Sequence, residues 1–114
     1  MEYLKEKYKD YFYIGVAVSP YSIKKQDEII KKHFNSLTCE NEMKYSSICP
    51  EPNKYNFKDA DEIYSYAKKN NMKMRGHTLV WHNQTPKWLF DIKDREQLLH
   101  TLRKHMQVMI GMGN

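Results

Sequence analysis

The chain has 114 residues, a formal net charge of +5, 40% hydrophobic residues and 29% charged residues. This composition fits one globular domain and excludes a disordered or membrane-embedded chain. The basic residues are mostly lysines spread along the expected helices, so we expect a solvated lysine-rich surface and no nucleic-acid partner.

No apolar run approaches the roughly 18 residues of a membrane span, so no membrane partner is expected. The N-terminus lacks the apolar core of a signal peptide, which predicts a cytoplasmic protein if Met1 is the natural start. Cys39 and Cys49 lie ten residues apart, outside any metal or redox spacing, so both are expected to be reduced.

The predicted elements alternate between helices and strands. A short charged helix over 2–9 precedes a buried strand over 11–18, which ends at Ser19-Pro20. Ser22 is predicted to cap a helix over 23–34. The remaining elements are a strand over 34–38, a helix over 57–70, a strand over 72–80 and a helix over 94–111.

Each longer helix shows apolar residues at three-to-four spacing, which predicts one buried face. The expected buried residues are Ile23, Ile30 and Phe34 in the first helix, Ala60, Ile63, Tyr64 and Ala67 in the second, and Leu98, Leu102, Met106 and Met109, with Leu99 and Ile110, in the third.

The order βαβαβα with helix-length crossovers requires parallel strands and right-handed connections. Three βα units leave two edge strands and cover one face of the sheet with helices. The strands look too apolar for a face in water. We therefore expect the chain to pair with further βα units or to be a piece of something larger.

Charged and polar residues follow the second strand, where residues 40–44 read ENEMK. On a continuing strand Glu40 and Glu42 would share one face, with their Cα atoms roughly 6.6 Å apart. Paired carboxyl groups about 5–5.5 Å apart are typical of retaining glycosidases. The alternative is a pair of exposed charges neutralised by Lys44 or another lysine.

The third strand ends in a second polar and aromatic group containing His77, Trp81, His82 and Gln84. The spacing of the two histidines puts them on opposite faces of a continuing strand, so no metal site is predicted. Taken singly, these histidines and Trp81 and Trp88 also fit structural roles. His33, His100 and His105 are expected at the surface or its boundary.

Together the two strand ends offer carboxylates, amides, imidazole, ammonium and indole at one rim, a mixture that suits sugars. No glycine-rich phosphate loop, dinucleotide fingerprint or Ser/His/Asp triad spacing is present. The residues therefore favour a carbohydrate ligand and no cofactor.

At these positions the sequence resembles family 10 glycoside hydrolases, the endo-β-1,4-xylanases with a (β/α)8 barrel. Residues 76–86 read GHTLVWHNQTP, similar to the family's third-strand signature, and ENEMK at 40–44 is similar to the second-strand signature. Residues 14–17 and 57–61 fit the first strand and second helix. The resemblance covers essentially the whole chain and implies the first three βα units of the barrel, over residues 1–114, ending before strand four.

The resemblance implies a binding role for six residues and a catalytic role for none. Glu40, Asn41 and Lys44 would bind the sugar on the non-reducing side of the cleavage point. His77 and Gln84 would hydrogen-bond sugar hydroxyls at and beside that point, and Trp81 would wall the pocket. In the family pattern Glu42 has no catalytic role.

The family's acid/base glutamate follows strand four and its nucleophile follows strand seven, and neither motif occurs here. The resemblance therefore implies part of the site of an intracellular endo-xylanase that trims xylo-oligosaccharides, without hydrolysis by this chain alone. Two further readings are a self-associating half-barrel, joined through its exposed sheet edges, and a weak xylan-binding module. A hydrolase using Glu40 and Glu42 in an assembly is a fourth.

Overall fold

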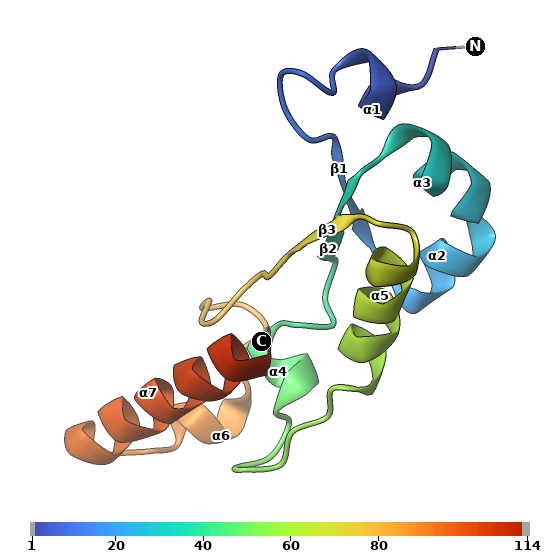
Figure 1. Cartoon of the computed structure of the whole chain (residues 1–114). Helices are drawn as coiled ribbons and strands as arrows, with labels where there is room; N and C mark the ends of the chain where they lie inside the picture. Colours follow the sequence, from blue (N-terminus) through green and yellow to red (C-terminus); the bar gives the residue numbers. More distant parts are fainter. Residues whose placement is uncertain (1, 113–114) are drawn as a thin grey trace. The chain divides into compact units, whose positions relative to one another are not determined.

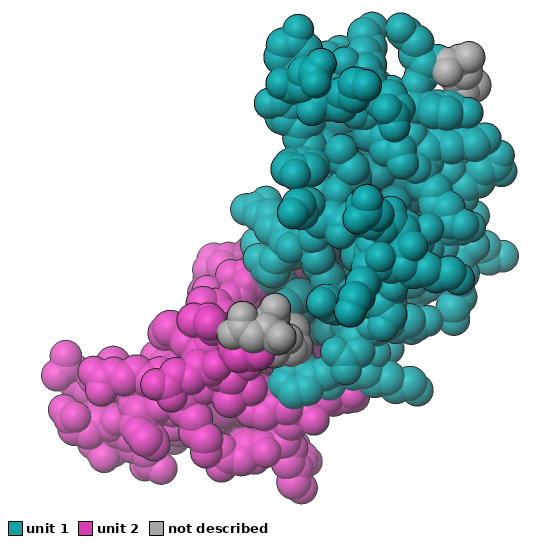
Figure 2. Space-filling model, in the orientation of Figure 1, with its two compact units in different colours: residues 1–43, 57–77 teal, residues 44–56, 78–114 magenta. Residues whose placement is uncertain are grey.

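The computed structural model of the chain describes residues 2–112. It consists of two compact units, unit 1 (Met1–Met43 and Phe57–His77) and unit 2 (Lys44–Asn56 and Thr78–Asn114), drawn in different colours in Figure 2. Among residues 2–112, no helix has the length and apolar character needed to cross a bilayer.

Unit 1 is built on a parallel sheet in the order β1-β2-β3, as predicted (Figure 1). The strands are β1 (Gly15–Val18), β2 (Ser36–Cys39) and β3 (Lys73–Arg75). All three strands begin later than expected, and β3 also ends earlier, whereas β2 ends one residue later than expected. Residues 11–13 are exposed before β1, and only residues 36–38 of β2 pair with β3, so the pairing of β3 stops at Arg75.

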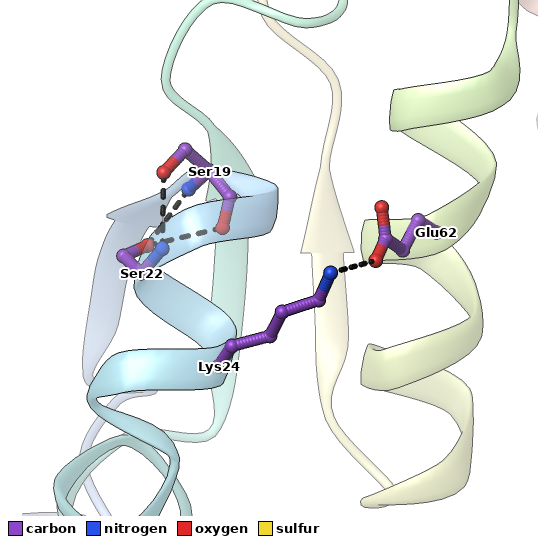
Figure 3. Close-up of polar contacts among 4 residues, drawn as sticks. All are labelled: Ser19, Ser22, Lys24 and Glu62. Carbon is purple, nitrogen blue, oxygen red and sulfur yellow. Dashed lines mark hydrogen bonds and ion pairs between the residues drawn. The ribbon is translucent and has the colours of Figure 1, made fainter.

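The helices of unit 1 are α1 (Leu4–Lys7), α2 (Pro20–Lys25), α3 (Asp27–His33) and α5 (Lys58–Lys69). The predicted cap at Ser22 is wrong, because Ser19 is the N-cap of α2 and Pro20 stands in its first turn. Ser22 instead completes a capping box with Ser19, in which each side chain bonds the other residue's backbone N–H (Figure 3). The single helix predicted over 23–34 is two helices that meet at Gln26.

Helices α2 and α5 lie on the same side of the sheet, where the core of unit 1 forms (Figure 1). Tyr64 was predicted to be buried and is 45% exposed, whereas Tyr66 packs against this core and donates a 2.6 Å hydrogen bond to Asp27. The core consists of Val18, Ile23, Ile30, Leu37, Cys39, Ile63, Ala67 and Met72.

The other face of the sheet carries small, hydroxyl and basic residues. Strand alternation places one row of Gly15, Ser36 and Lys73 and a second row of Ala17, Thr38 and Arg75 on it. The expectation that this face would be apolar is therefore wrong. The apolar members of each strand are the residues that turn toward the helices.

Unit 2 contains α4 (Tyr45–Ile48), α6 (Lys87–Phe90) and α7 (Arg95–Met112). The last of these matches the predicted helix closely, whereas the two short helices were not predicted. On α7 Met109 is buried and Ile110, expected on the buried face, is 63% exposed. The other buried apolar residues of unit 2 include Tyr45, Ile48, Cys49 and Leu89.

His105 corrects another expectation, since its side chain on α7 is 1% exposed and not at the surface. Its ring stacks on that of Tyr45 with centroids 3.5 Å apart and planes 2° from parallel. His33 and His100 are half-buried and exposed, as expected. Both cysteines are buried and free, which agrees with the expected reduced state.

Candidate functional site

An open hollow of about 540 Å³ lies on the polar face of the sheet in unit 1. Its ionisable lining groups include the side chains of Glu40, Arg75 and His77. The other lining residues are Tyr13, Gly15, Val16, Ala17, Ser36, Thr38 and Cys39. A carboxylate, a guanidinium and an imidazole thus border one space whose floor is made of small residues.

The backbone of the sheet brings Glu40 and His77 to this hollow. Thr38 and Arg75 form the last pair of β2 and β3, and Glu40 and His77 each follow two residues later, just past the ends of these strands, where both line the hollow. The Glu40 N–H donates a 2.8 Å hydrogen bond to Val18 O, which continues the β1–β2 pairing one residue beyond β2. Both side chains are exposed to solvent.

The structure separates the two carboxylates that the sequence placed on one strand face. β2 ends at Cys39, and residues 40–44 form bends and a turn. The Glu42 side chain folds back and accepts a 3.1 Å hydrogen bond from the backbone N–H of Asn41. Asn41 is half-buried. Within residues 2–112, Glu40 is the one carboxylate that lines the hollow. Because β2 ends before both glutamates, the expectation of a shared strand face for the pair is wrong.

Unit 2 carries Trp81 and Gln84 on the loop over 78–86. Trp81 is 39% exposed, so it is not a core residue, and Lys44 Nζ lies 5.2 Å from the centre of its ring. The Lys44 contact is a cation–π interaction. The backbone of Gln84 has φ 55°, and its carbonyl accepts a 2.9 Å hydrogen bond from Ser46 N–H.

The hydroxyl of Thr85 donates a hydrogen bond to the carbonyl of Trp81, and this closes the loop on itself. Trp88, for which a structural role was also considered, is half-buried, and its Nε1–H donates a 3.2 Å hydrogen bond to the Cys49 carbonyl oxygen. Of the two tryptophans, Trp81 is the more exposed to solvent.

The electrostatics of the buried groups argue against a thiol nucleophile. Burial, and secondarily the charge of Glu42, raises the pKa of Cys39 to about 12, so the thiol stays protonated near neutral pH. Burial also raises the pKa of Cys49. Among residues 2–112, no group of three or more His, Cys, Asp and Glu residues is arranged to hold a metal ion.

Sequence reasoning missed Arg75 and Tyr13 in the hollow and His105 beneath the loop of unit 2. The signal for Arg75 was available, since it stands two residues before His77 and alternation puts the two on one face. His105 had a signal as well, because it lies three residues after Leu102 and four before Met109, on the apolar face of α7.

The comparison with known proteins decides the family, because residues 3–112 match the model of glycosyl hydrolase family 10. The chain belongs to this family. It is 53% identical over 108 residues to a beta-1,4-xylanase of Dictyoglomus thermophilum, and this match covers 95% of this chain and 30% of that protein.

Two solved family 10 neighbours agree with the fold. Xylanase XynB from Paenibacillus barcinonensis, complexed with a conduramine derivative, superposes with a TM-score of 0.93 at 39% identity, covering 98% of this chain and 35% of that chain. The second neighbour is a mutant of TsXylA, an intracellular xylanase from Thermoanaerobacterium saccharolyticum, in complex with xylotriose. It superposes with a TM-score of 0.91 at 42% identity, covering 98% of this chain and 38% of that chain.

The family 10 chain therefore spans about a third of the length of these relatives. Its parallel strands and crossover helices correspond to part of the (β/α)8 barrel of these xylanases, which confirms the fold expected from the resemblance.

Proposed function

We propose that the chain is the N-terminal part of an endo-1,4-β-xylanase and contributes the glycone-side portion of its sugar site. In this proposal Glu40, Asn41 and His77 of unit 1 and Lys44, Trp81 and Gln84 of unit 2 bind xylose units. The observation that carries it is the hollow that Glu40 and His77 both line, just past the ends of two parallel strands. Active sites of (β/α)8 enzymes are built at these strand ends.

The chemistry of the residues suits xylan better than a charged ligand. Carboxylate, amide and imidazole groups hydrogen-bond sugar hydroxyls in pairs, and an exposed indole provides a flat apolar surface for the pyranose ring. A xylotriose complex of a 42% identical family member supports the same ligand class.

The two carboxyl groups of a retaining mechanism come, in this proposal, from parts of the barrel outside these three βα units. A retaining glycosidase needs a nucleophile and an acid/base about 5–5.5 Å apart. Of the residues that the structure describes, Glu40 is the single carboxylate at the hollow, while Glu42 accepts a backbone hydrogen bond, which favours binding over hydrolysis for this segment. An intracellular location is part of the proposal and is supported by the description of TsXylA.

Calorimetric titration of the chain with xylobiose tests the binding part. We expect a measurable heat, at least about tenfold weaker binding in Glu40→Gln and in Trp81→Ala, and little change in the control Glu42→Gln. No heat at millimolar xylobiose, or equal loss in the control, would remove the assigned binding site.

Hydrolysis of an aryl β-xylobioside tests the catalytic part. The chain alone should not hydrolyse the substrate, and hydrolysis should appear when the complementary part of a family 10 barrel is added. Turnover by the chain alone that Glu42→Gln abolishes would instead establish catalysis by Glu40 and Glu42.

A second candidate function is self-association through the sheet edges. Among residues 2–112, β1 and β3 are each paired on one side only, which leaves backbone donors and acceptors on two edges. A concentration-dependent mass in sedimentation with unchanged circular dichroism would support it, and a strict monomer would exclude it.

A further inference from the structure

The buried imidazole of His105 has a hydrogen-bond partner on each of its ring nitrogens. Nδ1 lies 3.0 Å from the Tyr55 hydroxyl, and Nε2 lies 3.1 Å from the carbonyl oxygen of Leu79. One face of the ring is also covered, since it stacks on Tyr45, and the ring of Tyr55 lies nearly parallel to it with centroids 5.9 Å apart. The side chain is therefore fixed in position and in rotation.

The partners define the protonation of the ring. A carbonyl oxygen only accepts, so Nε2 carries the hydrogen that is donated to Leu79. Burial lowers the pKa of His105, which keeps the ring neutral, and Nδ1 then accepts from the Tyr55 hydroxyl. The network specifies one tautomer, with the proton on Nε2.

The bond to Leu79 reaches the loop that carries two of the proposed sugar-binding residues. Trp81 and Gln84 follow Leu79 by two and five positions on residues 78–86, which contain no helix or strand. The far part of the loop is anchored at Gln84 through Ser46 N–H. The His105 bond anchors the near part from a helix 26 residues away in the sequence.

We propose that His105 is a positioning residue for sugar binding, which fixes the loop over 78–86 through the Leu79 carbonyl so that Trp81 and Gln84 hold their binding geometry. This inference rests on the proposed function, because the benefit of a fixed loop is the binding of xylose units. The side chain itself is buried and touches no ligand.

The first experiment measures the imidazole of the unmodified chain by ¹⁵N nuclear magnetic resonance. We expect one nitrogen with the shift of a protonated Nε2, slow exchange of its hydrogen with water, and a coupling pattern that assigns Nδ1 as unprotonated. A proton on Nδ1, or a ring that exchanges between tautomers, would overturn the proposal without any variant having to fold.

The second experiment compares three variants by the amide shifts of residues 78–86 and by xylobiose titration. His105→Phe keeps a ring against Tyr45 but removes both hydrogen bonds, so it should move the loop shifts and weaken xylobiose binding about tenfold. His105→Gln offers a donor at a similar distance and should restore binding to within about threefold. His100→Gln, at an exposed position of the same helix, should change neither readout.

Unchanged loop shifts and affinity in His105→Phe would overturn the positioning role, as would an equal loss in His105→Gln. If the unmodified chain binds no xylobiose, the proposed function fails. The loop shifts of His105→Phe against His105→Gln then decide by themselves whether the histidine fixes the loop.

Discussion

The two units carry three proposed sugar-binding residues each, but they position them in different ways. In unit 1 the sheet backbone positions Glu40 and His77, because each follows the last paired residues of β2 and β3 by two positions and both line the same hollow. In unit 2 side chains do it, because the loop with Trp81 is held by Lys44, Thr85 and the ring of His105.

The difference extends to the buried interiors. The core of unit 1 is aliphatic apart from one cysteine and one methionine, so its stability depends on volume and packing. The buried residues of unit 2 include a tyrosine and a histidine in direct ring contact, so its stability also depends on hydrogen bonds and on protonation. Substitutions that change side-chain volume or remove a hydrogen bond, and changes of pH, should therefore affect the stability of the two units differently.

The largest effect is expected from Leu37→Ala in unit 1. Leu37 lies on the central strand and is 0% exposed, so truncation leaves a cavity among the helices and should lower the free energy of unfolding by about 3 kcal/mol. Urea unfolding followed by circular dichroism measures it. The control Ile29→Ala, at a residue 58% exposed, should change it by less than about 0.5 kcal/mol. Equal effects of the two would contradict the described core.

A smaller loss is expected from Tyr55→Phe in unit 2. The change keeps the ring but removes the hydroxyl that bonds His105 Nδ1, and a buried acceptor without its donor costs about 1–2 kcal/mol. The measurement is again urea unfolding, with Tyr11→Phe as control because Tyr11 is 78% exposed. If the two tyrosines behave alike, hydrogen bonding does not distinguish the interior of unit 2.

The stability of the chain should also depend on pH through His105. Its pKa in the folded chain is lowered from 6.5 by burial, an effect partly offset by the Leu79 carbonyl. The other titratable groups against the ring, Tyr45 and Tyr55, stay neutral because burial raises their pKa values, that of Tyr55 to about 12. The ring is thus surrounded by uncharged groups.

Below pH 6.5 the His105 side chain binds a proton in the unfolded chain but stays neutral in the folded chain until the pH reaches its lowered pKa. Stability is therefore complete above that pH and is lost as the pH falls toward the folded pKa, by at most about 1.4 kcal/mol per pH unit. The measurement is the difference in unfolding free energy between the unmodified chain and His105→Phe from pH 7.5 to 5. A difference that does not change with pH would show that His105 does not titrate in this way.

The sequence allowed much of unit 1 to be predicted because its signals are local and periodic. Alternation and helix-length crossovers gave the parallel order, and the spacing of Ala60, Ile63 and Ala67 identified the buried face of α5. The errors have physical causes. Ser22 looked like a cap because serine is a preferred N-cap residue, and Ser19, three residues earlier, is one too. The break at Gln26 has no proline or glycine to mark it.

Unit 2 was harder to predict because its contacts join residues far apart in the sequence. The polar character of His105 indicated the surface, and its burial depends on Tyr55, which lies 50 residues away. The candidate site shows the same division. Glu40 and His77 could be placed together from strand pairing, whereas the Lys44–Trp81 contact depends on loop geometry that no periodic pattern describes.

The smallest expected effect concerns a surface ion pair that joins α2 to α5 in unit 1 (Figure 3). Lys24 Nζ lies 3.5 Å from Glu62 Oε1, and the two side chains are 72% and 38% exposed. Water screens such a pair, so a double-mutant cycle with Lys24→Gln and Glu62→Gln should give a coupling below about 0.5 kcal/mol that vanishes in high salt. A coupling above about 1 kcal/mol would mean that charge, and not only aliphatic packing, holds the helices of unit 1 together, and it would remove the contrast with unit 2.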